Sequence, residues 1–337
     1  MPLLEVQHLR IEFPTRRGTL VAVDDISFTI GEGEVLGVVG ESGAGKSLTG
    51  AAIIGLLEPP GRIAGGEVRL DGRRIDNLVY DDLRKIRGRE IGAIFQDPLT
   101  SLNPLYTIGR QLIETIQTHT EMSISGARTR AIELLGEVGI PAPARRIDAY
   151  PHEFSGGMRQ RVVIALALSA NPRLIIADEP TTALDVSIQA QIIALLKRLC
   201  RDHGTAVMLI THDMGVIAET ADRVAVMYAG RIAEIGPVRA VVKNPSHPYT
   251  QGLMGSIPTI GHHLERLTQI DGAMPRLTEI PRGCAFNPRC PKAFDRCQKE
   301  RPDLLATEGP TRSACWRAAP AGVTGSRADE TSVTSHG

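Results

Sequence analysis

Apolar and polar side chains alternate in short runs over residues 3–30. In LEVQHLRIEF and VAVDDISFTI the alternation is typical of strands that bury one face. The stretch GEGEVLGVVG at 31–40 predicts a turn followed by a buried strand, and a helix is expected to begin after Gly45. Further strands separated by polar turns are expected over 63–95, in GGEVRLDGR and EIGAIFQ.

The pattern becomes helical from about residue 99 to 170, where leucine and isoleucine recur at three- and four-residue spacing. Two short apolar runs follow, LIIAD at 174–178 and AVMLITHD at 206–213, and both end in polar residues. Each run predicts a strand of a parallel sheet with functional groups at its carboxyl end. A helix is expected between them, at about 187–202, so the chain should form an α/β domain with a helical insert.

Proline and glycine become frequent beyond Asn244, and the chain there is expected to be a loop-rich appendage. The last stretch, AGVTGSRADETSVTSHG, has the composition of a disordered tail. The expected division is therefore a main domain at 1–255, with its helical part at about 99–170, an extension at 256–320 and a tail at 321–337.

Charge and hydropathy narrow the function classes. The chain has 38 lysines and arginines and 38 aspartates and glutamates, and this balance argues against a protein held on nucleic acid by charge. The longest apolar run, VVIALALSA at 162–170, is shorter than the roughly 18–20 residues of a membrane helix. The N-terminus, MPLLEVQHLRIEF, lacks a signal-peptide pattern. We expect a cytosolic chain, to which another polypeptide would supply any membrane-spanning part.

The segment GESGAGKS at 40–47 fits the phosphate-loop pattern G-x-x-x-x-G-K-[ST] and follows an apolar strand. Glycines let backbone N–H groups curl around phosphate oxygens, and the helix N-terminus adds a partial positive charge. Lys46 is expected to reach the β- and γ-phosphates and Ser47 to ligate Mg²⁺. A glycine-rich turn with a chance lysine is the alternative, which the preceding strand disfavours. The expected nucleotide-binding residues here are Gly40, Glu41, Ser42, Gly43, Ala44, Gly45, Lys46, Ser47 and Leu48.

Four polar residues follow other predicted strands. Asp178 and Glu179 end the run LIIADEP, and we assign Asp178 to Mg²⁺ and Glu179 to the base that polarises the attacking water. His212, in LITHD, is a candidate for the γ-phosphate or the water, although a lone histidine at a strand end is more often structural. Gln96, in IFQDP, is a candidate sensor of metal and water.

A further segment, EFSGGMRQR at 153–161, identifies a family. Together with GESGAGKS, Gln96, ADEP, TTALD and ITHD in this order, it resembles the ATP-binding cassette (ABC) ATPases over roughly residues 3–255. The resemblance implies a P-loop NTPase fold with a RecA-like core, an antiparallel β subdomain and a helical subdomain. It also implies ATP and Mg²⁺ as ligands.

In this family two cassettes meet head to tail, and the signature of one closes over the ATP of the other. The resemblance implies that Ser155, Gly156 and Gly157 act in trans, and that Asp185 communicates across the interface. Phe154 and Met158 replace the first and last residues of the consensus LSGGQ, but the serine and glycines remain. One aromatic, Phe13, falls where the family stacks adenine; a core phenylalanine is the alternative.

The chain also resembles the ATP-binding subunits of dipeptide and oligopeptide importers, to about residue 318. The segments that carry this resemblance are YPHEFSGGMRQR, FQDPLTSLNPLYTIGRQL and NPSHPYTQGLMGSIP. It implies a peripheral ATPase on the cytoplasmic face of the inner membrane, with a second ABC ATPase subunit, two permeases and an extracytoplasmic solute-binding protein. Nickel or another small solute is an alternative to peptide. A soluble ABC ATPase that is not part of a transporter is a second alternative, and a regulatory protein that binds ATP without hydrolysing it a third.

Four cysteines lie in the predicted extension: Cys284, Cys290, Cys297 and Cys315. A reducing cytosol argues against disulfides, and the spacing lacks the close pairs usual in zinc sites. Four thiolates suit a [4Fe–4S] cluster, which some peptide-importer ATPase subunits carry. Zinc and unligated thiols are the alternatives. Cys200, in an apolar helix, is expected to be a core residue.

Overall fold

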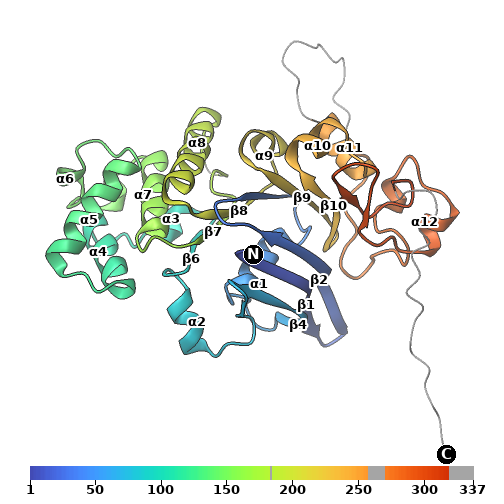
Figure 1. Cartoon of the computed structure of the whole chain (residues 1–337), viewed down its shortest axis with the longest axis horizontal. Coiled ribbons are helices and arrows are strands. Elements are labelled where there is room, and N and C mark those ends of the chain that lie inside the picture. The colour runs from blue at the N-terminus through green and yellow to red at the C-terminus, as the bar shows by residue number, and fades with distance from the viewer. Residues whose placement is uncertain (183, 257–269, 319–337) are drawn as a thin grey trace, which may run out of the picture.

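The computed structural model describes residues 1–182, 184–256 and 270–318. Two sheets lie at the centre of the molecule, with a group of helices at one end and the C-terminal extension at the other (Figure 1). The expected tail, 321–337, lies outside the described residues.

The smaller sheet is antiparallel, with strand order β2-β1-β4-β5. Its long strands pair directly, with Leu4 opposite Ile30 and also opposite Leu70. Alternating side chains of these strands enter a hydrophobic core, as the sequence pattern predicts. The strands are β1 (Leu4–Thr15), β2 (Gly18–Ile30), β4 (Arg62–Leu70) and β5 (Arg73–Arg74).

The larger sheet has strand order β11-β12-β10-β9-β3-β8-β7-β6, and its strands from β9 to β6 are parallel. Alternate residues of one strand enter different cores, Ile175 one and Ile176 the other, so both faces of the sheet are covered. The strands are β3 (Val35–Val39), β6 (Ile91–Ile94), β7 (Leu174–Asp178), β8 (Ala206–Thr211), β9 (Arg223–Tyr228), β10 (Arg231–Pro237), β11 (Leu305–Ala306) and β12 (Arg312–Ser313).

The helical insert packs its own apolar faces together. Thr107 and Ser123 cap two of its helices with side-chain oxygens, and Ile116 and Leu134 are fully buried between them. The elements are α3 (Pro98–Ser101), α4 (Ile108–His119), α5 (Ile124–Glu137), α6 (Pro143–Arg146), η1 (Pro151–Glu153) and α7 (Gly156–Leu168).

One interval differs from the sequence expectation. Strands with polar turns were expected over 63–95, but a helix, α2 (Tyr80–Ile86), occupies part of it. Its first turn carries Asp81 and Asp82 and its last turn Arg84 and Lys85, charges that oppose the helix dipole at each end. Only Ile86 of this helix is buried, so the segment lacks the apolar periodicity that predicts a helix.

The remaining helices cover the sheets or belong to the extension. They are α1 (Lys46–Ile53), α8 (Val186–His203), α9 (Met214–Thr220), α10 (Val238–Lys243), α11 (Pro248–Gly255), η2 (Asn287–Arg289) and α12 (Asp295–Lys299). The extension is rich in loops, yet it also joins the larger sheet, because β12 pairs with β10. None of the helices described is long and apolar enough to cross a membrane.

Candidate functional site

The phosphate loop connects β3 to α1, as its pattern predicts. Gly40 has φ 158°, and a Cβ there would collide with the carbonyl oxygen of Met227, so the loop needs glycine at this position. Lys46 folds back over the loop and donates to the carbonyl oxygens of Gly40 at 2.8 Å and Glu41 at 3.0 Å. Burial lowers the pKa of Lys46. A bound phosphate would give this buried ammonium an anionic partner.

Ser47 and Asp178 come together although they are far apart in sequence. The Ser47 hydroxyl donates to Asp178 Oδ1 at 3.0 Å, because α1 begins beside the carboxyl end of β7. Burial raises the pKa of Asp178, and the bond from Ser47 partly offsets this. Two adjacent oxygen ligands, one a half-buried carboxylate, fit Mg²⁺ in kind and position. The residues brought together here are the two that the sequence assigned to this metal.

Glu179 is the centre of a second cluster. Its carboxylate accepts hydrogen bonds from Thr182 Oγ1 at 2.6 Å and Gln96 Nε2 at 3.3 Å. His212 Nδ1 lies 3.3 Å from the other carboxylate oxygen. Burial raises the pKa of Glu179, but the bonds from Thr182 and His212 outweigh it and leave the pKa lowered. A carboxylate kept ionised can accept a proton.

The strand ends explain why these side chains meet. Glu179 directly follows β7, His212 follows β8 and Gln96 stands two residues after β6, and these parallel strands end at one edge of the sheet. Gln96 contacts Glu179 in this structure, and no bond joins it to Ser47 or Asp178. Thr182 was not singled out from the sequence, and its position three residues after Glu179 is the signal that could have found it.

The signature segment forms the N-terminus of α7. Ser155 caps this helix, and its side chain accepts from the backbone N–H of Met158 at 3.4 Å. Ser155 and Gly156 are exposed, whereas Phe154 is buried at 2% exposure in the helical core. Phe154 and Met158, the two residues that differ from the consensus, thus face the helical core or its edge. The exposed Ser155 and Gly156 leave the N-terminus of α7 accessible to an anion.

Asp185 lies beside the signature, at the start of α8. It occupies the N-cap position, makes no side-chain capping bond and is exposed. Helices α7 and α8 pack closely here: a Cβ added to Gly157 of α7 would lie 2.9 Å from a methyl group of Ile188 on α8. The signature and Asp185 therefore share one surface.

Phe13 lies on β1 and is partly buried against the core. It lines a cavity of about 330 Å³ that Ser47, Leu48 and Asp178 also line. Its ring packs against Gly61, where a Cβ would lie 2.7 Å from the ring. Contact with the core and access to the cavity are both present, so the structure leaves both interpretations of Phe13 open.

A contact between the phosphate loop and the extension was missed in the sequence. Arg289 Nη1 lies 2.9 and 3.1 Å from the two carboxylate oxygens of Glu41, and the Arg289 side chain is only 7% exposed. Arg289 also donates to the carbonyl oxygen of Asp271 at 2.9 Å. A carboxylate in a loop that binds phosphates would repel them unless a cation neutralised it. The presence of Glu41 in the loop was therefore the sequence signal that a cation must lie nearby.

The segment NPSHPYTQGL holds the same loop from another side. The hydroxyl of Tyr249 accepts a hydrogen bond from the backbone N–H of Glu41 at 2.9 Å. His247 caps α11 by accepting from the Tyr249 N–H, and the buried Glu234 carboxylate accepts from the N–H groups of Ser246 and His247. The residues of this segment thus build a buried support beneath the phosphate loop.

All four cysteines of the extension line one small cavity of about 20 Å³. They are free thiols, and burial raises the pKa of Cys284 to about 11. Among the described residues, however, no three His, Cys, Asp or Glu side chains are placed so that they could hold a metal ion. The donor set is right in kind, but a cavity of this size holds about one water molecule, so the expected [4Fe–4S] site is not supported by this geometry.

Cys200 differs from these four. It is buried on α8, as expected, and burial raises the pKa of its thiol to about 12. It is a core residue.

Two family models match the chain. The model of the ABC transporter family matches residues 23–182, and that of the oligopeptide/dipeptide transporter C-terminal region matches residues 233–297. The second match runs from β10 through α11 to α12, and so includes the support beneath the phosphate loop and three of the four cysteines.

Curated relatives match almost the whole chain. The chain is 47% identical to the dipeptide transport ATP-binding protein DppD of Escherichia coli, over 94% of this chain and 96% of the relative. It is 47% identical to the oligopeptide transport ATP-binding protein AppD of Bacillus subtilis, over 93% of this chain and 96% of the relative. It is 48% identical to OppD, the oligopeptide transport ATP-binding protein of Salmonella typhimurium, over 94% and 93%.

Solved structures match the cassette part. The dimeric ATP-binding cassette MJ0796, in a post-hydrolysis state bound to ADP and phosphate, superposes with a TM-score of 0.63 at 31% identity, covering 70% of this chain and 99% of that one. CbiO1 from Clostridium perfringens gives a TM-score of 0.62 at 28% identity, covering 72% and 91%.

Proposed function

The chain belongs to the ATP-binding subunits of ABC transporters, in the family of dipeptide and oligopeptide importers, and we propose that it powers uptake of such peptides by hydrolysing ATP. The convergence of Gln96, Thr182 and His212 on Glu179 carries this proposal, because it gives the phosphate loop a base held in one orientation. The relatives named for dipeptide and oligopeptide transport support the choice of substrate.

Hydrolysis follows from the positions of these groups. The Lys46 ammonium binds the β- and γ-phosphates, and Glu179 accepts a proton from water while the water oxygen bonds to the γ-phosphorus and the bond to the ADP oxygen breaks. His212 holds the water or the γ-phosphate from the other side. Ser47 and Asp178, with Gln96 as the third proposed ligand, would hold Mg²⁺, and the ion would supply positive charge to the phosphates.

ATP closes the site together with a second cassette. The exposed Ser155 and Gly156 and the half-buried Gly157 present a helix N-terminus that can bind an anion. In the assembly they cover the ATP of a second ABC ATPase subunit, and Asp185 at the same surface links the two sites. Phe13 stacks on the adenine, and its cavity adjoins Ser47.

The complete machine contains more polypeptides. Two permeases span the membrane, an extracytoplasmic solute-binding protein delivers the peptide, and this chain sits peripherally on the cytoplasmic face of the inner membrane. The named relatives are transport ATP-binding proteins, which supports this arrangement.

A pull-down tests the assembly. The tagged chain is expected to recover two multi-span permeases and a second ABC ATPase from membranes solubilised in mild detergent. The reconstituted complex should then accumulate a dipeptide only when ATP is present, and the complex carrying Glu179→Gln should assemble without transporting. Transport of nickel instead of peptide would change the substrate, and recovery of soluble partners alone would refute the transporter function.

The four cysteines of the extension hold a [4Fe–4S] cluster in this proposal. Cys284, Cys290, Cys297 and Cys315 line one cavity, and none of them forms a disulfide. Four thiolates are the ligand set of such clusters. The thiols would have to move apart to accept it, because the cavity of about 20 Å³ is far smaller than a cube of eight atoms. Its role would be to hold together a segment that has little core of its own.

Metal analysis of protein purified without oxygen tests this site. Iron, acid-labile sulfide and a broad visible absorption are expected in the wild-type chain and in Cys200→Ser, and all three should be lost in Cys290→Ser. Detection of zinc without sulfide would mean that the cysteines hold zinc instead of the cluster. Detection of neither iron nor zinc would mean that the four thiols are unligated.

A further inference from the structure

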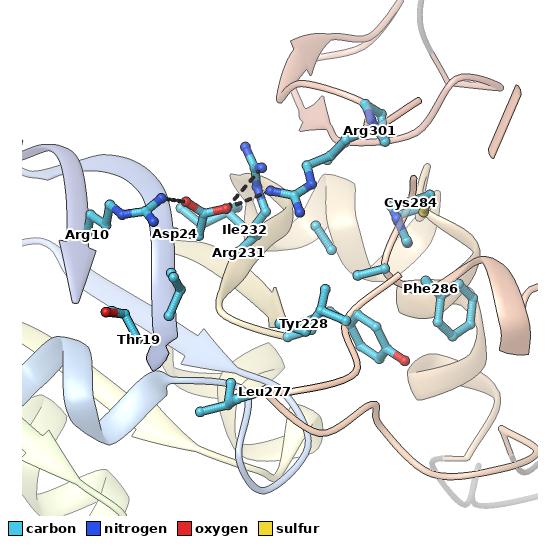
Figure 2. A pocket seen from close by; sticks show the side chains of 18 residues that line it. Arg10, Thr19, Asp24, Tyr228, Arg231, Ile232, Leu277, Cys284, Phe286 and Arg301 are labelled. Carbon is cyan, nitrogen blue, oxygen red and sulfur yellow. Dashed lines mark hydrogen bonds and ion pairs between the residues drawn. The ribbon is translucent and has the colours of Figure 1, made fainter. Parts of the chain in front are cut away.

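A cavity of about 350 Å³ lies where three parts of the chain meet, away from the catalytic edge. Its walls come from β1 and β2 of the antiparallel sheet, from the turn between β9 and β10, and from the extension (Figure 2). This volume is within the range of small-molecule sites in proteins, which is about 300–1,000 Å³. Nothing in the proposed ATPase mechanism uses this cavity.

Three guanidinium groups in this cavity surround a single carboxylate. Arg10 donates to Asp24 Oδ1 at 2.7 Å, and Arg301 donates to Asp24 Oδ2 at 2.6 Å. Arg231 approaches the same Oδ2 from a third direction, and Figure 2 shows Asp24 between the three. Three further carboxylates lie outside the cavity lining: Glu12 pairs with Arg10, and the charges of Asp25 and Asp303 act on Arg231. The cavity lining itself therefore carries an excess of positive charge.

Arg231 is the group left without full compensation. Its guanidinium lies 3.6 Å from Asp24 and 3.8 Å from Asp25, both beyond hydrogen-bond distance, and the described residues offer it no closer partner. Its side chain is only 23% exposed. Burial, and then the charge of Arg301, lower the pKa of Arg231. An oxyanion in the cavity would supply the hydrogen bonds and the charge that this guanidinium lacks.

The other wall of the cavity is apolar. Val21, Ile232, Leu277 and Phe286 contribute side chains to it, so a ligand there needs an apolar body as well as an anionic head. The head should carry one charge, because Arg231 is the one guanidinium of the three that forms no hydrogen bond with Asp24. We propose that this cavity is a regulatory site for a small organic carboxylate with an apolar body, bound through Arg231.

The walls of the cavity are bonded to the phosphate loop, which makes regulation possible. The N–H of Asp24 donates to the carbonyl oxygen of Gly230 at 2.9 Å, and the N–H of Gly230 donates to that of Ala44 at 3.0 Å. Gly45 lies so close to Ala22 that a Cβ would be 3.1 Å from its carbonyl oxygen. A ligand that moves Asp24 or Arg231 therefore moves the turn that touches the phosphate loop.

Calorimetry on the purified full-length chain tests binding. N-acetyl-L-leucine, a carboxylate with an apolar side chain, is expected to bind saturably at millimolar concentration. N-acetyl-L-leucinamide has the same body without the charge and should not bind, and inorganic phosphate should bind more weakly. Absence of saturable carboxylate binding would refute the proposal. Equal binding of the amide would refute the role of the guanidinium, and tighter binding of phosphate would refute the assignment to a carboxylate.

Matched variants locate the site. Arg231→Met should lower the affinity for N-acetyl-L-leucine by at least about tenfold, which is the effect of losing one charged hydrogen bond. Arg231→Lys should lower this affinity less. Arg84→Met, a change of the same kind at an exposed position of α2, should bind as the wild type does. Equal affinity in all three variants would place the ligand elsewhere. Circular dichroism confirms that each variant is folded.

The effect on ATP separates this inference from the proposed function. N-acetyl-L-leucine should change the dissociation constant for ATP by about threefold or more in the wild type and not in Arg231→Met. An unchanged value in the wild type would refute the regulatory role. Failure of the chain to bind ATP at all would count against the proposed function, while carboxylate binding would still be measured by itself.

Discussion

The phosphate loop lies between the residues around Glu179 on one side and the C-terminal extension on the other. The contacts on the two sides differ in length and in exposure. On the catalytic side, Gln96 and His212 reach Glu179 only at 3.3 Å, and the His212 side chain is 63% exposed. On the side of the extension, Arg289 is 7% exposed and lies 2.9 Å from Glu41. The contacts of Gln96 and His212 with Glu179 are therefore long, although Thr182 lies only 2.6 Å from Glu179, whereas the contact of Arg289 with Glu41 is short and Arg289 is buried.

This difference suits a catalytic role for the residues around Glu179 and a structural role for the contacts with the extension. Catalytic hydrogen bonds are often long before substrate binds and shorten in the reactive complex, which fits the arrangement around Glu179. The contacts of Arg289 and Tyr249 with Glu41 need no ligand, so they hold the loop in one position before ATP arrives. Changes on the first side should therefore affect turnover, and changes on the second should affect nucleotide affinity and stability.

The largest effect is expected on the catalytic side. Glu179→Gln removes the proton acceptor but keeps the shape, so ATP hydrolysis by the assembled transporter should fall by about 10²–10⁴-fold while ATP still binds and holds the dimer closed. Phosphate release measures this, with Glu121→Gln, an exposed glutamate on the helical insert, as the control. Normal steady-state turnover in Glu179→Gln would contradict the assignment of the base.

A smaller effect of another kind is expected from Arg289→Met. The substitution leaves Glu41 without its cation beside the phosphates, so the KM for ATP should rise about tenfold while kcat changes little. The folded chain should also lose about 2 kcal/mol of unfolding free energy, less than for a fully buried pair because Glu41 is 29% exposed. ATPase kinetics and urea unfolding measure the two effects.

Two variants control this prediction. Arg276→Met lies at an exposed position of the same extension and should change neither quantity. The double variant Glu41→Gln with Arg289→Met removes both charges and should recover part of the affinity for ATP. A fall in kcat with an unchanged KM would place Arg289 in the catalytic step rather than in support of the loop.

The smallest effect concerns the support beneath the loop and depends on pH. Burial lowers the pKa of His247 from 6.5 to about 4, and its Nδ1 must be unprotonated to accept from the Tyr249 N–H. The unfolded chain therefore binds more protons than the folded chain between about pH 6.5 and 4, so stability falls as pH falls through this window.

The expected loss is about 2 kcal/mol between pH 7.5 and 5. His247→Asn keeps an oxygen that can cap the helix but does not titrate, so it should lack this part of the pH dependence. Urea unfolding at both pH values measures the difference between the two proteins. Parallel pH profiles would show that the histidine is not neutral in the folded chain.

The sequence predicted which polar side chains meet at the carboxyl ends of the parallel strands, for a physical reason. A short apolar run such as LIIA, directly before Asp178, favours a buried strand. Parallel strands end at one edge of a sheet, so the polar residues after them meet there. Asp178 beside Ser47, and His212 and Gln96 beside Glu179, follow from this rule. By contrast, the helix α2 was missed, because its charges stabilise it without an apolar period.

What the sequence alone determined is the strands as far as β8, the phosphate loop and the polar groups that meet beside it, since local patterns and short motifs encode them. The strands from β9 to β12 were not predicted. Only the tertiary structure decided that Arg289 neutralises Glu41 and that three arginines share Asp24. Arg289 and Glu41 lie 248 residues apart along the chain, and Arg301 and Asp24 lie 277 residues apart, whereas Arg10 is only 14 residues from Asp24. Their pairing depends on how β12 joins β10 and brings the extension back to the phosphate loop, and no local pattern records that.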